Sequence, residues 1–150
     1  AAEVTPVGSF LPGGVIQVPP GTTHIPAGAF AGYRRPAAAV LPCGVEEIGE
    51  GAFEGLSTLA RVNLPEGLVR IGKRAFAGCT GLRILELPAS ITSIGDRSFE
   101  DCVLLPNIKY RGSKEQWMQI DKTWYWCGWE MTMEIVCTDG VVREDWYFPY

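Results

Sequence analysis

The residues able to perform chemistry are few in this 150-residue chain, and they do not gather at the spacings that catalysis requires. The single histidine, His24, follows Thr22 and Thr23 on the outward side of an expected turn. A catalytic histidine needs a nucleophile and an orienting group at fixed positions, and the sequence identifies neither. The glycine pairs also lack the strand–loop–helix context of a phosphate-binding loop. We therefore expect a protein that is not an enzyme and that holds no cofactor.

The five cysteines form no recognisable metal or disulfide pattern. Their number is odd and none belongs to a Cys-x-x-Cys pair, which argues against a zinc site and against a disulfide scaffold. Cys79 and Cys102 occupy the same position in two successive copies of a repeat, so we expect both to be buried as small apolar side chains. Cys127 and Cys137 remain a possible disulfide near the C-terminus.

Cys79 and Cys102 belong to a 23-residue repeat that organises the chain from residue 13 to residue 110. Phenylalanine, isoleucine and proline each recur at this interval. The recurring residues are Phe30, Phe53, Phe76 and Phe99, then Ile25, Ile48, Ile71 and Ile94, and finally Pro19, Pro42, Pro65 and Pro88. A period in the twenties is the signature of a solenoid, in which each coil buries its apolar face against the next.

Each coil is expected to contribute one short strand to a parallel sheet. In the phrase Val62-Asn63-Leu64 the apolar residues alternate with a polar one, which is typical of a half-buried strand. The phenylalanines should stack in the interior beside the isoleucines. The glycines that follow the isoleucines are Gly49, Gly72 and Gly95. At these positions we expect either a positive φ or close approach of a neighbouring backbone.

Both ends of the chain depart from the repeat within what we interpret as a single domain. Residues 1–12 lack the motif and are interpreted as an N-terminal cap or a remnant of a further coil. Residues 111–140 are interpreted as a C-terminal cap made of a helix and a strand, followed by a tail at 141–150. The cap would close the core that the last coil leaves open.

Local signals within residues 111–140 support this interpretation. Ser113 and Gln116 match a capping box at the start of a helix. Trp117, Ile120 and Trp124 then share one helical face. Alternation over residues 132–137 predicts a strand, and Asp139-Gly140 marks the turn after it.

Composition excludes several classes of function. The net charge of −4 argues against a nucleic-acid-binding protein, which would usually present a basic face. No apolar run approaches the ~20 residues that cross a bilayer, so we expect no direct membrane insertion. The first ten residues lack the charged and apolar regions of a signal peptide.

The repeat resembles a known family. The phrase Leu-x-x-Ile-x-Leu-Pro followed by Ile-Gly-x-x-Ala-Phe-x-x-Cys, clearest over residues 82–102, is similar to the BspA-like leucine-rich repeats of bacterial surface proteins. Residues 110–113 and 136–140 resemble the ending common in these proteins. The resemblance implies an α/β repeat fold: a right-handed solenoid of 23-residue coils with a parallel sheet on one face. It also implies a secreted or cell-surface bacterial protein, often linked to adhesion, without shared catalytic residues.

The outward face of the strand sheet is the first candidate binding site, because solenoids commonly bind extended partners across such a surface. Its candidate residues are Arg61, Asn63, Ile84, Glu86, Asn107 and Lys109. The alternative is that these are ordinary solvated positions. If the site is real, we expect alanine at the polar positions to weaken partner binding while the fold stays intact. The expected partner is an extracellular protein, either a host matrix protein or another bacterial surface protein.

Aromatic residues near the C-terminus are the second candidate. Tyr125, Trp126 and Trp129 lie in an expected loop, where exposed rings can stack on sugars or anchor an interface. Trp117 and Trp124 are better explained as cap core by their helical spacing. Two rivals to a protein-binding module therefore remain, a carbohydrate-binding module that uses these rings and a passive spacer domain.

Overall fold

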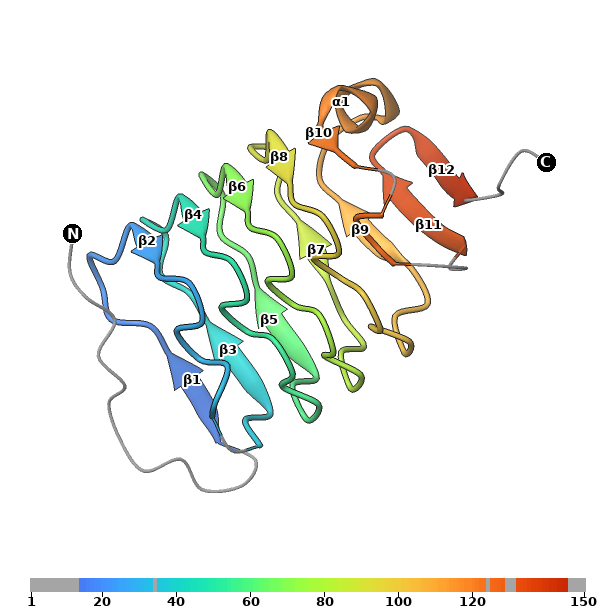
Figure 1. Cartoon of the computed structure of the whole chain (residues 1–150). Helices are drawn as coiled ribbons and strands as arrows, with labels where there is room; N and C mark the ends of the chain where they lie inside the picture. Colours follow the sequence, from blue (N-terminus) through green and yellow to red (C-terminus); the bar gives the residue numbers. More distant parts are fainter. Residues whose placement is uncertain (1–13, 34, 124, 129–131, 146–150) are drawn as a thin grey trace.

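The computed structural model describes residues 14–33, 35–123, 125–128 and 132–145, whose coils stack side by side along one axis (Figure 1). One side of the solenoid carries the longer strands. β1 (Val15–Gln17), β3 (Ala38–Val40) and β5 (Arg61–Asn63) pair in parallel. β7 (Glu86–Leu87), β9 (Ile108–Tyr110), β11 (Thr132–Cys137) and β12 (Gly140–Asp145) continue this side. We call it the strand face.

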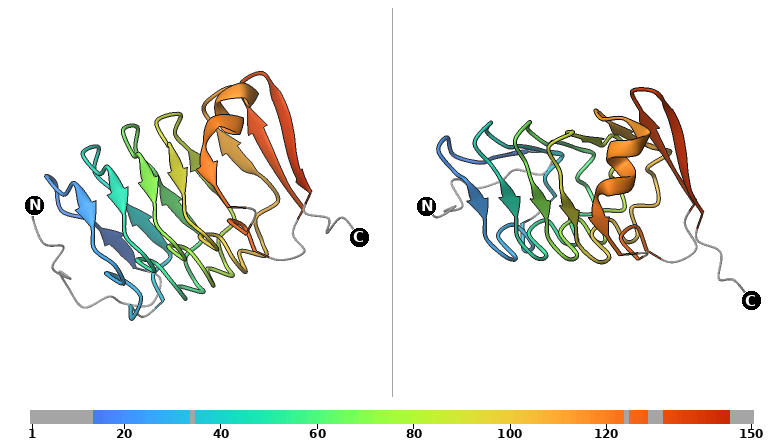
Figure 2. Two further views of the ribbon diagram at one scale, coloured as in Figure 1. Left: turned by 45° about the horizontal axis from the view of Figure 1, so that its top comes forward. Right: turned by 90° about the horizontal axis from the view of Figure 1, so that it is seen from above.

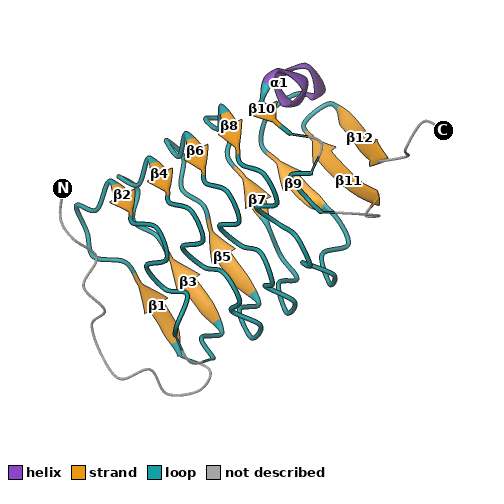
Figure 3. Ribbon diagram, viewed as in Figure 1, coloured by secondary structure: helices purple, strands orange, loops and turns teal. Residues whose placement is uncertain are grey.

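A second row of strands was not expected from the sequence. β2 (His24–Ile25), β4 (Glu47–Ile48), β6 (Arg70–Ile71), β8 (Ser93–Ile94) and β10 (Asp121–Lys122) form a five-stranded parallel sheet. Figure 3 shows the two rows joined by loops, and Figure 2 shows how evenly the coils repeat. The prediction of one strand per coil was therefore wrong. Each of these strands has only two residues, too few to show alternation in the sequence.

Stacked phenylalanines fill the interior, as predicted. The ring centroids of Phe30 and Phe53 are 5.1 Å apart, those of Phe53 and Phe76 5.0 Å, and those of Phe76 and Phe99 5.3 Å. The last two pairs are parallel to within 2°. The isoleucine column is buried beside these rings, with Ile48, Ile71 and Ile94 at most 2% exposed. Each interior column is thus continuous from coil to coil.

The glycine column allows the coils to approach closely. A Cβ on Gly72 would lie 2.8 Å from main-chain atoms of the preceding coil, and Gly49 and Gly95 are equally crowded. None of the three has a positive φ. Of the two reasons expected for these glycines, close approach is the one that operates.

Cys79 and Cys102 are buried, as predicted, and they have a further task. The Cys79 thiol donates to the carbonyl of Phe53 at 3.2 Å, and the Cys102 thiol donates to that of Phe76 at 3.3 Å. Burial raises the pKa of Cys79 to about 12 and raises the pKa of Cys102 as well. Both thiols therefore stay protonated and serve as hydrogen-bond donors between coils.

The C-terminal cap begins with α1 (Lys114–Gln119). The predicted capping box is present, because Ser113 accepts from the Gln116 amide while the Gln116 side chain accepts from the Ser113 amide. Trp117, the buried residue of α1, is fully covered. Trp124 lies outside the described residues.

The predicted tail at 141–150 needs correction over its first residues. β12 pairs antiparallel with β11 from Thr132↔Asp145 to Cys137↔Gly140. Gly140 takes a φ of 145° and opens β12, and the chain reverses at the two residues before it, Thr138 and Asp139. Residues 146–150, like the expected N-terminal cap at 1–12, lie outside the described residues.

Non-repeat residues occupy the repeat columns where the solenoid meets the cap. Lys122 pairs with Ile94 and so stands in the isoleucine column. Its ammonium lies 4.9 Å from the Trp117 ring centroid and 3.8 Å from Glu144 Oε1. The Trp117 indole N–H donates to the same Glu144 oxygen at 2.7 Å. Trp126 packs edge-on against Phe99, with ring centroids 6.1 Å apart, and covers the phenylalanine stack.

The possible disulfide between Cys127 and Cys137 is not formed. β11 pairs with β9 through Ile135↔Ile108 and Val136↔Lys109, so Cys137 follows in the column of Tyr110 on the strand face. Cys127 follows Trp126, next to the phenylalanine stack.

A candidate binding groove on the strand face

A groove with a volume of about 520 Å³ runs over the outward side of β1, β3, β5 and β7. Four of the six predicted strand-face residues line it, namely Arg61, Asn63, Ile84 and Glu86. Asn107 and Lys109 belong to the next coil and lie outside its lining. Beyond β7 the groove is lined by Arg111, which follows β9.

Branched aliphatic side chains form the apolar part of the groove. Val15, Val40 and Ile84 remain 42%, 46% and 65% exposed. Ala38 also lines the groove but is nearly covered, at 6% exposed. Exposed aliphatic groups gathered on one face are typical of an interaction surface.

The Asn63 side chain is already engaged by the fold. Its Oδ1 accepts from the Leu41 amide at 2.8 Å, and its Nδ2 donates to the Leu41 carbonyl at 3.1 Å. The amide thus completes the backbone pairing between two coils. Alanine at this position would leave the Leu41 amide without this acceptor, so we expect it to lower stability as well as to affect binding.

Glu86 is also engaged, by a residue that the sequence reading did not identify. Arg111 Nε donates to Glu86 at 2.7 Å, and Arg111 Nη1 donates to Glu66 at 3.1 Å. The hydrogen bond from Arg111 lowers the pKa of Glu86. A signal was available, because Arg111 stands one full repeat after Pro88 and so replaces a proline of the repeat.

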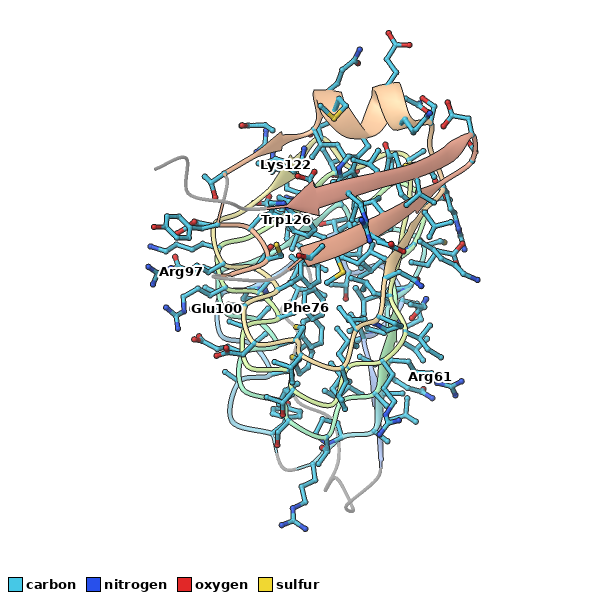
Figure 4. The ribbon with its side chains drawn as sticks, turned by 90° about the vertical axis from the view of Figure 1, so that its right-hand side faces the viewer. Arg61, Phe76, Arg97, Glu100, Lys122 and Trp126 are labelled. Carbon is cyan, nitrogen blue, oxygen red and sulfur yellow. The ribbon has the colours of Figure 1, made fainter. Side chains whose placement is uncertain are left out.

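Arg61 differs from these polar neighbours. Within the described residues it makes no ion pair and no side-chain hydrogen bond. Figure 4 shows its side chain pointing outward on the opposite side of the solenoid from Arg97, with Phe76 in the interior between them. In the sheet it lies between Ala38 and Ile84. Its charge is therefore available within largely apolar surroundings.

The aromatic candidates near the C-terminus are only partly accessible. Trp126 is fully buried against Phe99 and Trp117, so its prediction as a ligand-binding ring was wrong. The reason is that the last phenylalanine needs a cover. Tyr125 is half-buried, with the Arg97 guanidinium 5.8 Å from its ring centroid. Trp129 lies outside the described residues.

Other kinds of site were sought over the part of the chain that the structure describes. It contains no cluster of three or more His, Cys, Asp or Glu side chains able to hold a metal ion. It also contains no helix long and apolar enough to cross a membrane. The groove is where the predicted strand-face residues and a hollow in the described part of the chain coincide.

Stacked coils, a parallel strand face and a groove lined by outward side chains define a leucine-rich-repeat solenoid, a class that generally serves as an interaction module. The family model described as "BspA type Leucine rich repeat region" matches six copies over residues 16–123. The chain belongs to this family of BspA-type leucine-rich repeats, as its motifs indicated. No curated protein gives a match to the chain.

Solved structures with the same fold come from bacterial leucine-rich-repeat proteins. A leucine-rich cell surface protein of Faecalibacterium prausnitzii is 30% identical, with a TM-score of 0.55 over 71% of this chain and 34% of its own. A leucine-rich-repeat protein of Bacteroides capillosus is 26% identical, with a TM-score of 0.58 over 65% of this chain and 77% of its own. That of T. pallidum is 26% identical, with a TM-score of 0.51 over 65% of this chain and 58% of its own. The chain thus spans about a third of the Faecalibacterium protein.

Proposed function

We propose that this domain binds another protein through the groove on its strand face, at a bacterial surface or after secretion. The observation that supports this most is the gathering of exposed Val15, Val40 and Ile84 in one groove of a folded solenoid. Solenoids use such extended faces for binding. Placement at the surface is supported by the family and by the similar Faecalibacterium cell surface protein.

A protein partner fits the groove better than a sugar does. Among the described residues no aromatic ring lines the groove, whereas sugar sites usually place rings against the sugar face. Of the predicted aromatic set, Trp126 is buried and Tyr125 is half-buried in the described part of the chain. Val62 and Leu64 also border the groove, but both residues are only 5% exposed, so the exposed aliphatic groups and Arg61 make up most of its accessible surface.

The test is a binding screen with surface variants. The chain is passed over immobilised host matrix proteins and bacterial surface proteins, and in parallel over a glycan array. Ile84→Glu and Val40→Glu should each weaken binding to the protein that is captured, because a buried unpaired carboxylate is costly. Met118→Glu is the matched control, since Met118 is 67% exposed on α1, away from the groove.

Circular dichroism must show that all three variants are folded. Binding that is unchanged in both groove variants would exclude the groove as the contact. Capture by glycans alone would favour the carbohydrate-binding rival, and silence on both arrays would favour the spacer.

A further inference from the structure

The groove carries one positive charge that nothing in the described residues balances. Its ionisable lining residues are Arg61, Glu86 and Arg111. Glu86 and Arg111 form an ion pair at 2.7 Å, and Arg111 also reaches Glu66 at 3.1 Å. Arg61 has no such partner within the described chain. The chain as a whole has a net charge of −4, so this cation stands out against its surroundings.

The surroundings of Arg61 are apolar on both sides along the stack. It pairs with Ala38 of β3, and an isolated bridge joins it to Ile84, which is 65% exposed. Val40 stands on the same β3 strand at 46% exposed. A positive charge between aliphatic groups is complementary to a ligand that places a carboxylate between aliphatic side chains.

Regular pairing between the coils is reduced to a single bridge at Arg61. Ile84, which precedes β7, forms an isolated bridge with Arg61, and the Arg83 and Ile84 amides donate to the Ala60 carbonyl at 3.0 and 3.4 Å, whereas β3 and β5 pair over three residues. A polypeptide in extended conformation places alternate side chains on one face, so it can present a carboxylate and aliphatic groups to the groove together.

A polyanion does not fit this arrangement. Nucleic acids and sulfated chains are held by rows of cations that neutralise successive charges. Here the neighbouring carboxylates of Glu86 and Glu66 flank Arg111, and they would repel a second negative charge a short distance from the first. The groove suits a single carboxylate.

We propose that the groove binds an extended polypeptide segment in which one Asp or Glu is flanked by branched aliphatic residues. The carboxylate pairs with Arg61, and the aliphatic side chains pack on Val40 and Ile84. This inference rests on the proposed function and names the chemistry of its partner. Arg61 then acts as the specificity-determining residue, and the aliphatic groups supply most of the buried apolar area.

The experiment uses an array of nine-residue peptides with alternating Val or Ile and a central Asp, beside matched sets with central Asn or Lys. The labelled full chain is the probe. We expect the Asp set to retain about tenfold more chain than the Asn set, and the Lys set to retain least. This preference should shrink as NaCl rises from about 50 mM to about 500 mM.

Variants at Arg61 make the test specific. Arg61→Gln should remove the difference between the Asp and Asn sets, and Arg61→Glu should reverse the preference in favour of Lys. Arg70→Glu is the matched control, because Arg70 is exposed on β6 of the other sheet and the net charge changes equally. It should keep the preference for Asp.

Equal retention of the three peptide sets, or retention of none, overturns the inference. So does a preference for Asp that survives Arg61→Glu. The proposed function would still stand if Ile84→Glu weakens binding to a captured protein while no charge preference appears. It would fail separately if Ile84→Glu and Val40→Glu leave that binding unchanged.

Discussion

The inner coils and the coil beneath the cap fill the same columns by different means. In the inner coils the isoleucine column continues through Ile48, Ile71 and Ile94, each covered by the next. Beneath the cap the column ends in Lys122, whose ammonium lies against Trp117 and Glu144. The phenylalanine stack likewise ends under the edge-on ring of Trp126.

The comparison shows which side chains an interior repeat position accepts. An inner position has a coil on each side, so it must be apolar and of constant size. At the cap, helix α1 and strand β12 replace the next coil, and a polar side chain is accepted because its partners come from the cap. The repeat is uniform where neighbours repeat, and it varies where they do not.

The largest loss of stability is expected from Phe76→Ala. Phe76 stacks on both Phe53 and Phe99, so its removal opens a cavity with rings on two sides. We expect the free energy of unfolding to fall by about 4 kcal/mol, measured by urea denaturation. Phe30→Ala should cost less, because Phe30 stacks on only one phenylalanine of the described chain. Equal losses would show that stacking on both sides does not matter.

Gly72→Ala should cause the second-largest loss of stability. Its Cβ would lie 2.8 Å from main-chain atoms of Gly49, Glu50 and Ile48, and two coils would have to separate. We expect a loss of about 3 kcal/mol in the free energy of unfolding. Gly32→Ala is the matched control, since a Cβ there meets nothing within 4 Å. If both variants lose the same stability, close approach is not the reason for the glycine column.

The stability of the cap should depend on the charge of its buried side chains more than on their volume. Glu144→Gln keeps an acceptor for the Trp117 indole but leaves Lys122, only 11% exposed, without its carboxylate. We expect a loss of about 2 kcal/mol in thermal or urea unfolding. Adding Lys122→Met should restore part of it, because the unpaired ammonium is then gone. A double variant less stable than Glu144→Gln alone would contradict this account of the cap.

The smallest effect is expected at the groove, where Arg111 joins Glu86 and Glu66. Arg111→Ala should cost under about 1 kcal/mol at neutral pH, since all three side chains are nearly half exposed or more. The lowered pKa of Glu86 means that this contribution is present above the ordinary pKa of about 4.3 and is lost as pH falls through the lowered value. Urea unfolding of both proteins from neutral to acidic pH measures the difference. A difference that persists in acid would assign it to packing.

Residues that depart from the repeat carry information about side-chain contacts between elements, and the sequence-based prediction did not use all of them. Arg111 replaces a proline and Lys122 replaces an isoleucine, and both turn out to form ion pairs across coils. The hairpin partner of β11 was missed although Asp139-Gly140 was recognised as a turn. The two-residue strands of the second sheet were too short to predict.

The sequence by itself determined the coil length, the interior columns and the family. A constant repeat period specifies which residue stacks on which, because a residue and its counterpart one period later are neighbours in space. Only the tertiary structure decided which outward residues remain available. Asn63 pairs with Leu41, 22 residues away, and Arg111 with Glu86 and Glu66, 25 and 45 residues away. Such side-chain contacts depend on reach and direction across coils, which no repeat pattern encodes, and within the described chain they leave Arg61 as the unpaired charge of the groove.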